Sequence, residues 1–303
     1  MADERYIARF EDDFPARLRF IPGCPSGIYV KGELPDPERK TVAIVGSRAC
    51  SHYGYSMAEY FASHLASAGV QIVSGMARGI DGIAQRAALD AGGVSYGVLG
   101  FGLDVIYPKE NKDLFDMITE RGGLITEHPG GTQPVKAFFA SRNRIISGLC
   151  DLLLVIEARL QSGTSITVSN ALEQGRDVFA VPGRLTDPLS AGCNKLISEG
   201  AGIARTPDDI LRALGLSYEK PVVVKRRSRD DAFTVIKPAP AELTEKEKLV
   251  YECLDLYPKG LNELVRQTRL SVSELLETLI SLSVKGVAKE CAKHNYIKIW
   301  QNW

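Results

Sequence analysis

The feature that most constrains the fold is an alternation that begins at residue 41 and continues to about residue 215. Short apolar runs alternate with glycine-containing loops and with amphipathic stretches. The stretch 54–69, for example, places Met57, Phe61 and Leu65 at helical spacing before Gly69, which is a typical helix stop. The apolar runs predict strands at 41–45, 70–74, 94–99, 123–127, 151–157 and 177–181.

These predicted strands carry apolar residues on both faces, as in the run DLLLVIEA at 151–158. Strands of that kind belong to a parallel sheet that helices cover on both sides. The regular alternation of strand and helix therefore predicts an α/β fold. We expect an extended Rossmann-like, doubly wound and mostly parallel sheet, with a small C-terminal winged-helix domain after it.

The domain organisation follows from where this alternation starts and stops. Residues 1–40 contain several prolines and indicate an irregular N-terminal extension packed on the α/β domain, which spans residues 41–215. Residues 216–241 combine prolines with charge runs, as linkers do. Residues 242–303 predict the winged-helix domain, because a helix capped by Thr244 precedes a helix–turn–helix pattern and a hairpin.

Composition narrows the possible ligands. The 303-residue chain has a formal net charge of +0, so a nucleic-acid ligand would need a local basic patch. Its six cysteines form no CxxC pair, which argues against a metal site or a disulfide framework. No apolar stretch approaches the roughly 20 residues that span a bilayer, and the acidic start is unlike a secretory signal. We expect a cytoplasmic protein with no metal, cofactor or membrane partner.

Glycines, small polar residues and cations follow the predicted strands at the point where each strand ends. In an open parallel sheet, ligands bind beyond these carboxyl ends. Glycines let backbone N–H groups approach a ligand, and a helix N-terminus adds about half a positive charge. Taken together, we interpret these loops as a phosphate-binding site rather than as plain tight turns. The candidates are Gly46, Ser47, Arg48, Arg78, Gly79, Tyr107, Lys109, Lys112, Ser162, Gly163 and Thr164.

The segment FFASRNRIISGL at 138–149 brings further cations, since Arg142 and Arg144 flank Asn143. On a regular helix the two arginines would diverge by about 200°. At a helix start, or in an extended lead-in, both could reach the edge of the sheet, and we count all three residues as candidates. The usual dinucleotide site is not indicated, because no G-x-G-x-x-G follows the first strand and no Walker A motif occurs.

A set of motifs resembles one family in both order and spacing. The DNA-processing protein A (DprA/Smf) family is matched by GSR at 46–48, ARGID at 77–81, GLDVIYPKEN at 102–111, RNRIISGL at 142–149, SGTSIT at 162–167, VPG at 181–183 and GCNKLI at 192–197. The resemblance implies a bacterial protein of natural transformation. Such a protein binds incoming single-stranded DNA, protects it, loads the RecA recombinase on it and forms a homodimer through the α/β domain.

Carried onto this chain, the resemblance places Gly46, Ser47 and Arg48 in the DNA pocket, with either Lys109 or Lys112. We expect a protein that is not an enzyme, because the sequence has no Walker A motif and no evident metal-binding carboxylate cluster that would support ATPase or nuclease activity. Where many family members have histidine after the ARGID motif, this chain has Gln85, which argues against histidine acid–base chemistry there. Among the aromatic residues near the loops, we expect Tyr107 to stack on a base, and Phe101, Phe138 and Phe139 to belong to the core.

Two other functions follow from the residues alone. An enzyme of related fold that hydrolyses nucleotides or ribosides would need a positioned carboxylate, such as Asp81, Asp104 or Glu157. We expect structural roles for these instead, with Asp81 capping a helix and Glu157 paired with Arg144 or Arg48.

A regulator that binds duplex DNA through the winged helix would need a basic recognition helix. The expected one, at 271–286, carries Glu274 and Glu277, and Lys285 only at its end. A protein-binding or regulatory role for the domain is therefore favoured.

Overall fold

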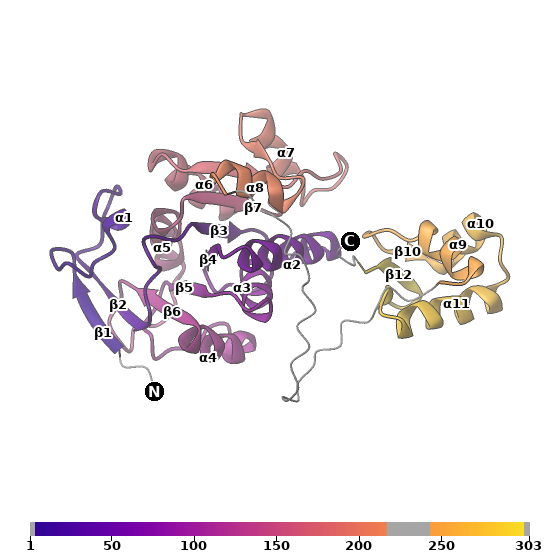
Figure 1. Cartoon of the computed structure of the whole chain (residues 1–303), viewed down its shortest axis with the longest axis horizontal. Coiled ribbons are helices and arrows are strands. Elements are labelled where there is room, and N and C mark those ends of the chain that lie inside the picture. Colours follow the sequence, from indigo (N-terminus) through magenta and orange to yellow (C-terminus); the bar gives the residue numbers. More distant parts are fainter. Residues whose placement is uncertain (1–3, 217–242, 300–303) are drawn as a thin grey trace, which may run out of the picture. The chain divides into compact units, whose positions relative to one another are not determined.

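The computed structural model describes residues 4–216 and 243–299. The chain divides into two compact units, residues 1–218 and residues 219–303 (Figure 1).

The first unit is built on a nine-stranded sheet with the strand order β1-β2-β6-β5-β4-β3-β7-β8-β9. The seven strands that follow β2 in this order, β6-β5-β4-β3-β7-β8-β9, pair in parallel, as the sequence predicts. Six of them match the predicted strands to within two residues; β9 is additional. Their bounds are β3 Thr41–Val45, β4 Gln71–Ser74, β5 Ser95–Leu99, β6 Gly122–Thr126, β7 Leu152–Val155, β8 Asp177–Ala180 and β9 Gly202–Ile203.

Helices cover both faces of this sheet, which explains why strands such as β3 are buried at every residue. On one side α2 (His52–Ser67) packs along α3 (Ile80–Asp90), and α3 contacts α4 (Lys112–Glu120). On the other side α5 (Lys136–Leu149) packs against α6 (Thr164–Glu173) (Figure 1). Two shorter helices, α7 (Ala191–Ser198) and α8 (Pro207–Ala213), complete the unit.

The N-terminal segment is not the irregular extension that its prolines predict. It forms β1 (Glu4–Ala8), α1 (Ala16–Arg19) and β2 (Gly27–Gly32). β1 pairs antiparallel with β2, and β2 pairs antiparallel with β6, so the segment extends the central sheet. The prediction was wrong because the prolines lie in the connections and at the start of α1, where they are compatible with neighbouring strands.

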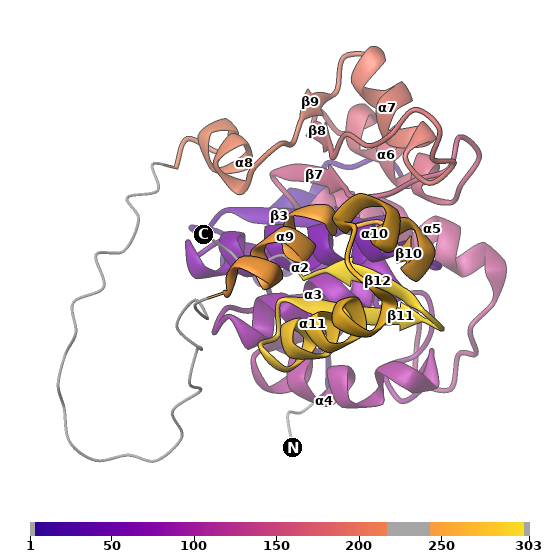
Figure 2. The ribbon, with the colours of Figure 1, turned by 90° about the vertical axis from the view of Figure 1, so that its right-hand side faces the viewer.

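The second unit has the winged-helix pattern that the sequence predicts (Figure 2). Its elements are α9 (Glu245–Cys253), β10 (Lys259–Gly260), α10 (Leu261–Thr268), α11 (Val272–Val284), β11 (Ala288–Ala292) and β12 (Asn295–Lys298). Thr244 caps α9 in a capping box with Glu247, as expected. Leu264, Leu275, Leu279 and Leu282 form the centre of its own hydrophobic core.

The sheet order creates a switch point between two central strands. The chain moves outward from β3 through β4 and β5 to β6, and then crosses back to β7, which pairs with the other side of β3. Loops that leave β3 and β7 at their carboxyl ends therefore diverge and leave a crevice between them. No helix in residues 4–216 or 243–299 is long and apolar enough to cross a membrane.

Candidate functional site

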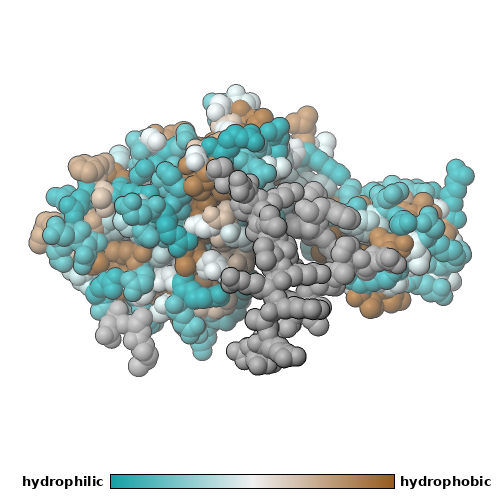
Figure 3. All heavy atoms as spheres, viewed as in Figure 1, coloured by the Kyte–Doolittle hydropathy of each residue, from teal (hydrophilic) through white to brown (hydrophobic). Residues whose placement is uncertain are grey.

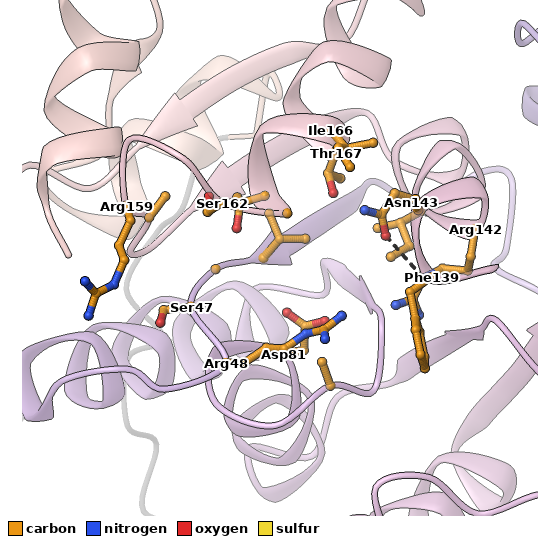
Figure 4. Close-up of a pocket in the computed structure, with 18 of the residues that line it drawn as sticks. Ser47, Arg48, Asp81, Phe139, Arg142, Asn143, Arg159, Ser162, Ile166 and Thr167 are labelled. Carbon is orange, nitrogen blue, oxygen red and sulfur yellow. Dashed lines mark hydrogen bonds between the residues drawn. The ribbon is translucent and has the colours of Figure 1, made fainter. Parts of the chain in front are cut away.

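A pocket of about 460 Å³ lies beyond the carboxyl ends of β3 and β7. We call it the switch-point pocket. Its walls are the 46–49 loop after β3 and residues 158–167 after β7, and it is closed by residues of α5 and by Asp81 (Figure 4). The residues that line it include Gly46, Ser47, Arg48, Asp81, Lys136, Phe139, Arg142, Asn143, Arg159, Ser162, Gly163 and Thr164.

Close backbone packing fixes the 46–48 loop. A side chain at Gly46 would come within 2.7 Å of Ile80 Cγ1, so only glycine fits there. The Ile80 N–H donates to the Ser47 carbonyl at 3.1 Å. Gly79, at the start of α3, adopts a φ of +72° against the same loop. Gly46 and Gly79 therefore serve to shape the wall, whereas Ser47 and Arg48 present groups to the pocket.

Arg48 is exposed, and its guanidinium carbon lies 5.4 Å from the centroid of the Phe139 ring. This is within the range of a cation–π contact. Among residues 4–216 and 243–299, no carboxylate forms an ion pair with Arg48, Lys136 or Arg159, although all three line the pocket. Asp81 attracts Arg48 electrostatically, but the pocket lining carries more cations than carboxylates, so it is positively charged overall.

The opposite wall contains the start of α6. Gly163 is its N-cap, and no atom lies within 4 Å of where a Gly163 side chain would begin. The Ser165 and Ile166 N–H groups already donate to the Ser162 and Gly163 carbonyls, at 3.1 and 3.3 Å. The N–H groups left for a ligand at this helix start are those of Gly163 and Thr164, and the helix dipole adds partial positive charge. The Ser162 hydroxyl is buried and has no hydrogen-bond partner among the described residues. Thr164 is buried at the first position of the helix.

Asp81 and Arg142 form the floor and are both buried. Arg142 donates from Nη1 to the Gly75 carbonyl at 2.7 Å and also to the Val98 carbonyl. Asp81 accepts from the Gly75 N–H at 3.2 Å. Burial raises the pKa of Asp81 and lowers that of Arg142 to about 10, while their mutual attraction opposes both shifts. These two residues hold the loop after β4 in place beneath the pocket.

The helix α5 is regular from Lys136 onward, so its two arginines diverge. Asn143 and Arg142 line the switch-point pocket, but Arg144 does not. Arg144 donates to Glu127 Oε2 at 2.6 Å and to the Gly23 carbonyl at 2.7 Å, which ties α5 to the N-terminal segment. The expectation that both arginines reach the pocket is wrong. It required an extended segment or a helix start at these residues, but Arg142 and Arg144 lie well inside α5, where helical geometry points them in different directions.

A second cluster of candidates follows β5 and lies outside the pocket lining. Lys109 begins the 3₁₀ turn Lys109–Asn111, and both Lys109 and Lys112 are exposed. Tyr107 is 44% exposed, and its ring centroid lies 5.7 Å from that of Phe139. Arg78 is also exposed and pairs with Glu110 at 2.8 Å. Phe139 therefore lies between the two regions: it contacts Arg48 of the switch-point pocket and Tyr107 of this second cluster.

The three carboxylates that were candidates for a catalytic role, Asp81, Asp104 and Glu157, all accept hydrogen bonds from backbone N–H or hydroxyl groups. Glu157 is fully buried and accepts from the Ser51 N–H at 2.9 Å and from the Ser51 hydroxyl. The expected pairing of Glu157 with Arg144 or Arg48 was therefore wrong, since Ser51 at the start of α2 occupies it. Asp104 accepts from the Gly131 N–H at 2.8 Å. Burial is the main cause of the raised pKa of Glu157.

Sequence reasoning missed Lys136 and Phe139, which both line the pocket. Phe139 was assigned to the core, but it is half-buried, whereas Phe101 is 1% exposed. A signal was present: residues 136, 139, 140, 143 and 146 recur at helical spacing and occupy one face of α5. Reading that face together would have placed Lys136 and Phe139 beside Asn143.

Comparisons with known proteins connect this geometry to a family. The family model described as DNA recombination-mediator protein A matches residues 5–215, and the DprA winged helix domain model matches residues 236–292. DNA processing protein DprA of Streptococcus pneumoniae is 46% identical over 201 residues, which cover 66% of this chain and 71% of that protein. Protein Smf of Escherichia coli is 45% identical over 202 residues, 66% of this chain and 54% of that protein.

Solved structures agree with the sequence matches. The X-ray structure of the Streptococcus pneumoniae DprA matches with a TM-score of 0.66 and 42% identity, over 71% of this chain and 75% of that chain. A structure of DNA processing protein A from Helicobacter pylori, described for its single-stranded DNA binding mode, matches with a TM-score of 0.62 and 28% identity. It covers 71% of this chain and 98% of that chain.

Proposed function

Since this chain belongs to the DNA recombination-mediator protein A (DprA/Smf) family, we propose that its switch-point pocket binds single-stranded DNA. The observation that carries the proposal is the contact of Arg48 with the Phe139 ring beside the open start of α6. A single strand offers phosphates and unpaired bases together, and this pocket pairs cations with an accessible aromatic ring.

Phosphates would bind to the cationic parts of the pocket. Arg48 supplies a forked and permanently charged donor, and Lys136 and Arg159 add charge without an intramolecular ion pair among the described residues. The start of α6, with Ser162, Gly163 and Thr164, supplies backbone N–H groups and a hydroxyl. Arg142 would not contact the DNA directly, because its guanidinium donates to the Gly75 and Val98 carbonyls. It would contribute its positive charge to the electrostatic potential of the pocket and hold the pocket floor in place.

Bases would stack on the aromatic rings next to this charge. Phe139 is half-buried, and Tyr107 is more exposed, so the pair offers successive planar surfaces. Beyond Tyr107 the strand would meet Lys109 and Lys112, which follow on the same loop. We propose that Arg48 and Phe139 bind the strand most tightly and that Tyr107 with one of the two lysines extends the contact.

The wider role follows from the family. We propose that the protein acts in the cytoplasm during DNA uptake, protects incoming single-stranded DNA, loads the RecA recombinase and forms a homodimer through the α/β unit. We propose further that it is not an enzyme and needs no cofactor. The carboxylates near the pocket support this, because Asp81, Asp104 and Glu157 are each engaged by neighbouring groups.

The test compares single-stranded and duplex DNA of equal length in a gel-shift assay with the full chain, over a series of salt concentrations. We expect the single strand to bind more tightly and its affinity to fall as salt rises. Equal affinity for both forms would contradict the proposal. Release of free base from nucleoside monophosphates, lost in Asp81→Asn, would favour the hydrolase instead.

A further inference from the structure

The winged-helix unit exposes an apolar face on α11 that its own core does not use. Leu275, Leu279 and Leu282 point into the core and are fully buried. On the outer face, Val272 is 48% exposed, Ile280 is 64% exposed and Val284 is 83% exposed, with Leu276 partly exposed between them. Figure 3 shows hydrophobic residues gathered at the lower edge of this unit, near the position of α11 in Figure 1.

This outer face has almost no charge. Glu274 accepts from Lys246 at 2.8 Å and also caps the helix with Ser271, on the side that faces α9. Lys285 donates to Glu247 at 2.6 Å, again toward α9. Glu277 is the exposed charge left on α11, and it lies at the flank of the apolar face. A helix without a free cation is poorly suited to bind DNA phosphates.

The residues of this face are arranged symmetrically about the level of Thr278, which is itself buried. Val272 lies six residues before Thr278 and Val284 six residues after it. Ser273 and Ser283 lie five residues before and after it, and Leu276 and Ile280 lie two residues before and after it. If a second α11 runs antiparallel and is level with the first at Thr278, each valine meets a valine, each serine a serine, and Leu276 meets Ile280. A face that is complementary to itself in this way fits a second copy of the same chain.

We propose that α11 is a self-association helix, which pairs antiparallel with α11 of a second copy about a twofold axis at the level of Thr278. The paired residues extend from Val272 to Val284, so the two helices must lie nearly antiparallel, with a shallow crossing angle of about 20°, for the valine pairs to meet as well as Leu276 and Ile280. Ser273 and Ser283 are small and allow close approach. The Ser283 hydroxyl already donates to the Leu279 carbonyl at 2.8 Å, so its burial leaves no unsatisfied donor.

The strength of this contact is set by its size. One pair of short helices buries less than the roughly 1,200 Å² of a standard stable interface, so the pairing is weak by itself. When another contact already holds two chains together, the effective concentration of one α11 near the other rises, and the pairing becomes more favourable. The proposal does not rest on DNA binding by the switch-point pocket, and the two can fail separately.

The first test measures self-association of the full chain by sedimentation equilibrium over a range of concentrations. We expect Ile280→Glu to weaken association about tenfold, because it places a charge in an apolar contact. The matched control is Leu249→Glu on α9, which adds the same charge at a residue 41% exposed outside this face. If both variants associate like the unchanged chain, or both weaken equally, the proposal is overturned.

The second test checks the antiparallel register. Leu276→Lys and Ile280→Glu are prepared separately and then mixed. In the proposed pairing, the lysine introduced in one copy faces the glutamate introduced in the other, while the unchanged Ile280 still meets the unchanged Leu276. The mixture should therefore associate more tightly than either variant alone, and no gain on mixing would exclude this register. Circular dichroism of each variant shows that the unit stays folded, which is expected because both positions are on the outer face.

Discussion

The guanidinium carbon of Arg48 lies 5.4 Å from the centroid of the Phe139 ring, although the two residues are distant in the sequence. Arg48 follows β3, and Phe139 lies in the second turn of α5, so the fold alone brings them together. The contact places a permanent positive charge over an aromatic surface at the mouth of the switch-point pocket. Charge and stacking can therefore be removed separately by mutation.

Replacing Arg48 should weaken binding without unfolding the protein. We expect Arg48→Ala to cost about 1–3 kcal/mol of binding free energy for any DNA sequence, since phosphates carry no base identity. The slope of log affinity against log salt should fall by about 0.7 for a lost contact to a single strand. Arg48→Lys should restore part of the affinity.

Arg48 is exposed and Glu157 is bound by Ser51, so Arg48→Ala should lower the melting temperature only slightly, through its lost contact with Phe139 and its lost attraction to Asp81. A clear drop in melting temperature with an unchanged salt slope would show that Arg48 has a structural role instead.

Replacing Phe139 should have the complementary effect. Phe139→Leu keeps an apolar side chain but loses the planar ring, and we expect it to cost about 1–3 kcal/mol for a stacked base, with the salt slope unchanged. Phe138→Leu is the control, because the Phe138 ring lies 4.3 Å from the His128 ring and not in the pocket lining. Equal loss in both variants would argue against stacking at Phe139.

Arg142 should behave as a structural residue. Arg142→Met leaves the Gly75 and Val98 carbonyls without this donor and leaves Asp81 buried without its nearest cation. We expect a loss of about 3–5 kcal/mol in unfolding free energy, measured by denaturant titration. Arg144→Met should cost less, because its partner Glu127 is partly exposed. If Arg142→Met kept full stability and lost only DNA binding, Arg142 would be a direct contact.

The α/β unit should bind DNA without the winged-helix unit. All the pocket residues lie before residue 168, and the unit has its own core. We expect a chain of residues 1–216 to keep single-strand affinity within about threefold, which is under about 1 kcal/mol. A folded truncation that no longer binds would place the site elsewhere.

The winged-helix unit should lose stability in acid. Hydrogen bonds from Lys285 and Ser281 hold the pKa of Glu247 at about 2, below its usual 4.5. A lowered pKa contributes stability above pH 4.5 that is lost as the pH falls toward 2. The protection factors of the amides in α9 and α11, which compare the observed hydrogen exchange with the intrinsic rate at each pH, should therefore fall over that range. In Glu247→Gln this pH dependence should largely disappear, and its persistence would assign the effect to another group.

Much of this molecule could be predicted from its sequence, because the signals are local. The apolar runs of 41–45 and 151–157 show that the strands are buried on both faces, and the alternation with helices sets the parallel order. The cap at Thr244 depends on a few neighbouring residues. The sequence could place one set of pocket-lining residues together because the strand that precedes each group ends at a known edge of the sheet: Gly46, Ser47, Arg48, Ser162, Gly163 and Thr164.

Tertiary structure decided which of these side chains have free hydrogen-bonding groups and which do not. Arg142, Asn143 and Arg144 are adjacent in sequence, yet burial ties Arg142 to two carbonyls and helical geometry turns Arg144 toward Glu127. The antiparallel strands β1 and β2 depended on pairing with β6, far along the chain. The sequence by itself determined the elements and the edge of the sheet at which the switch-point pocket lies. Only packing, which sets burial and partners across large separations, decided that Phe139 and Arg48 meet there.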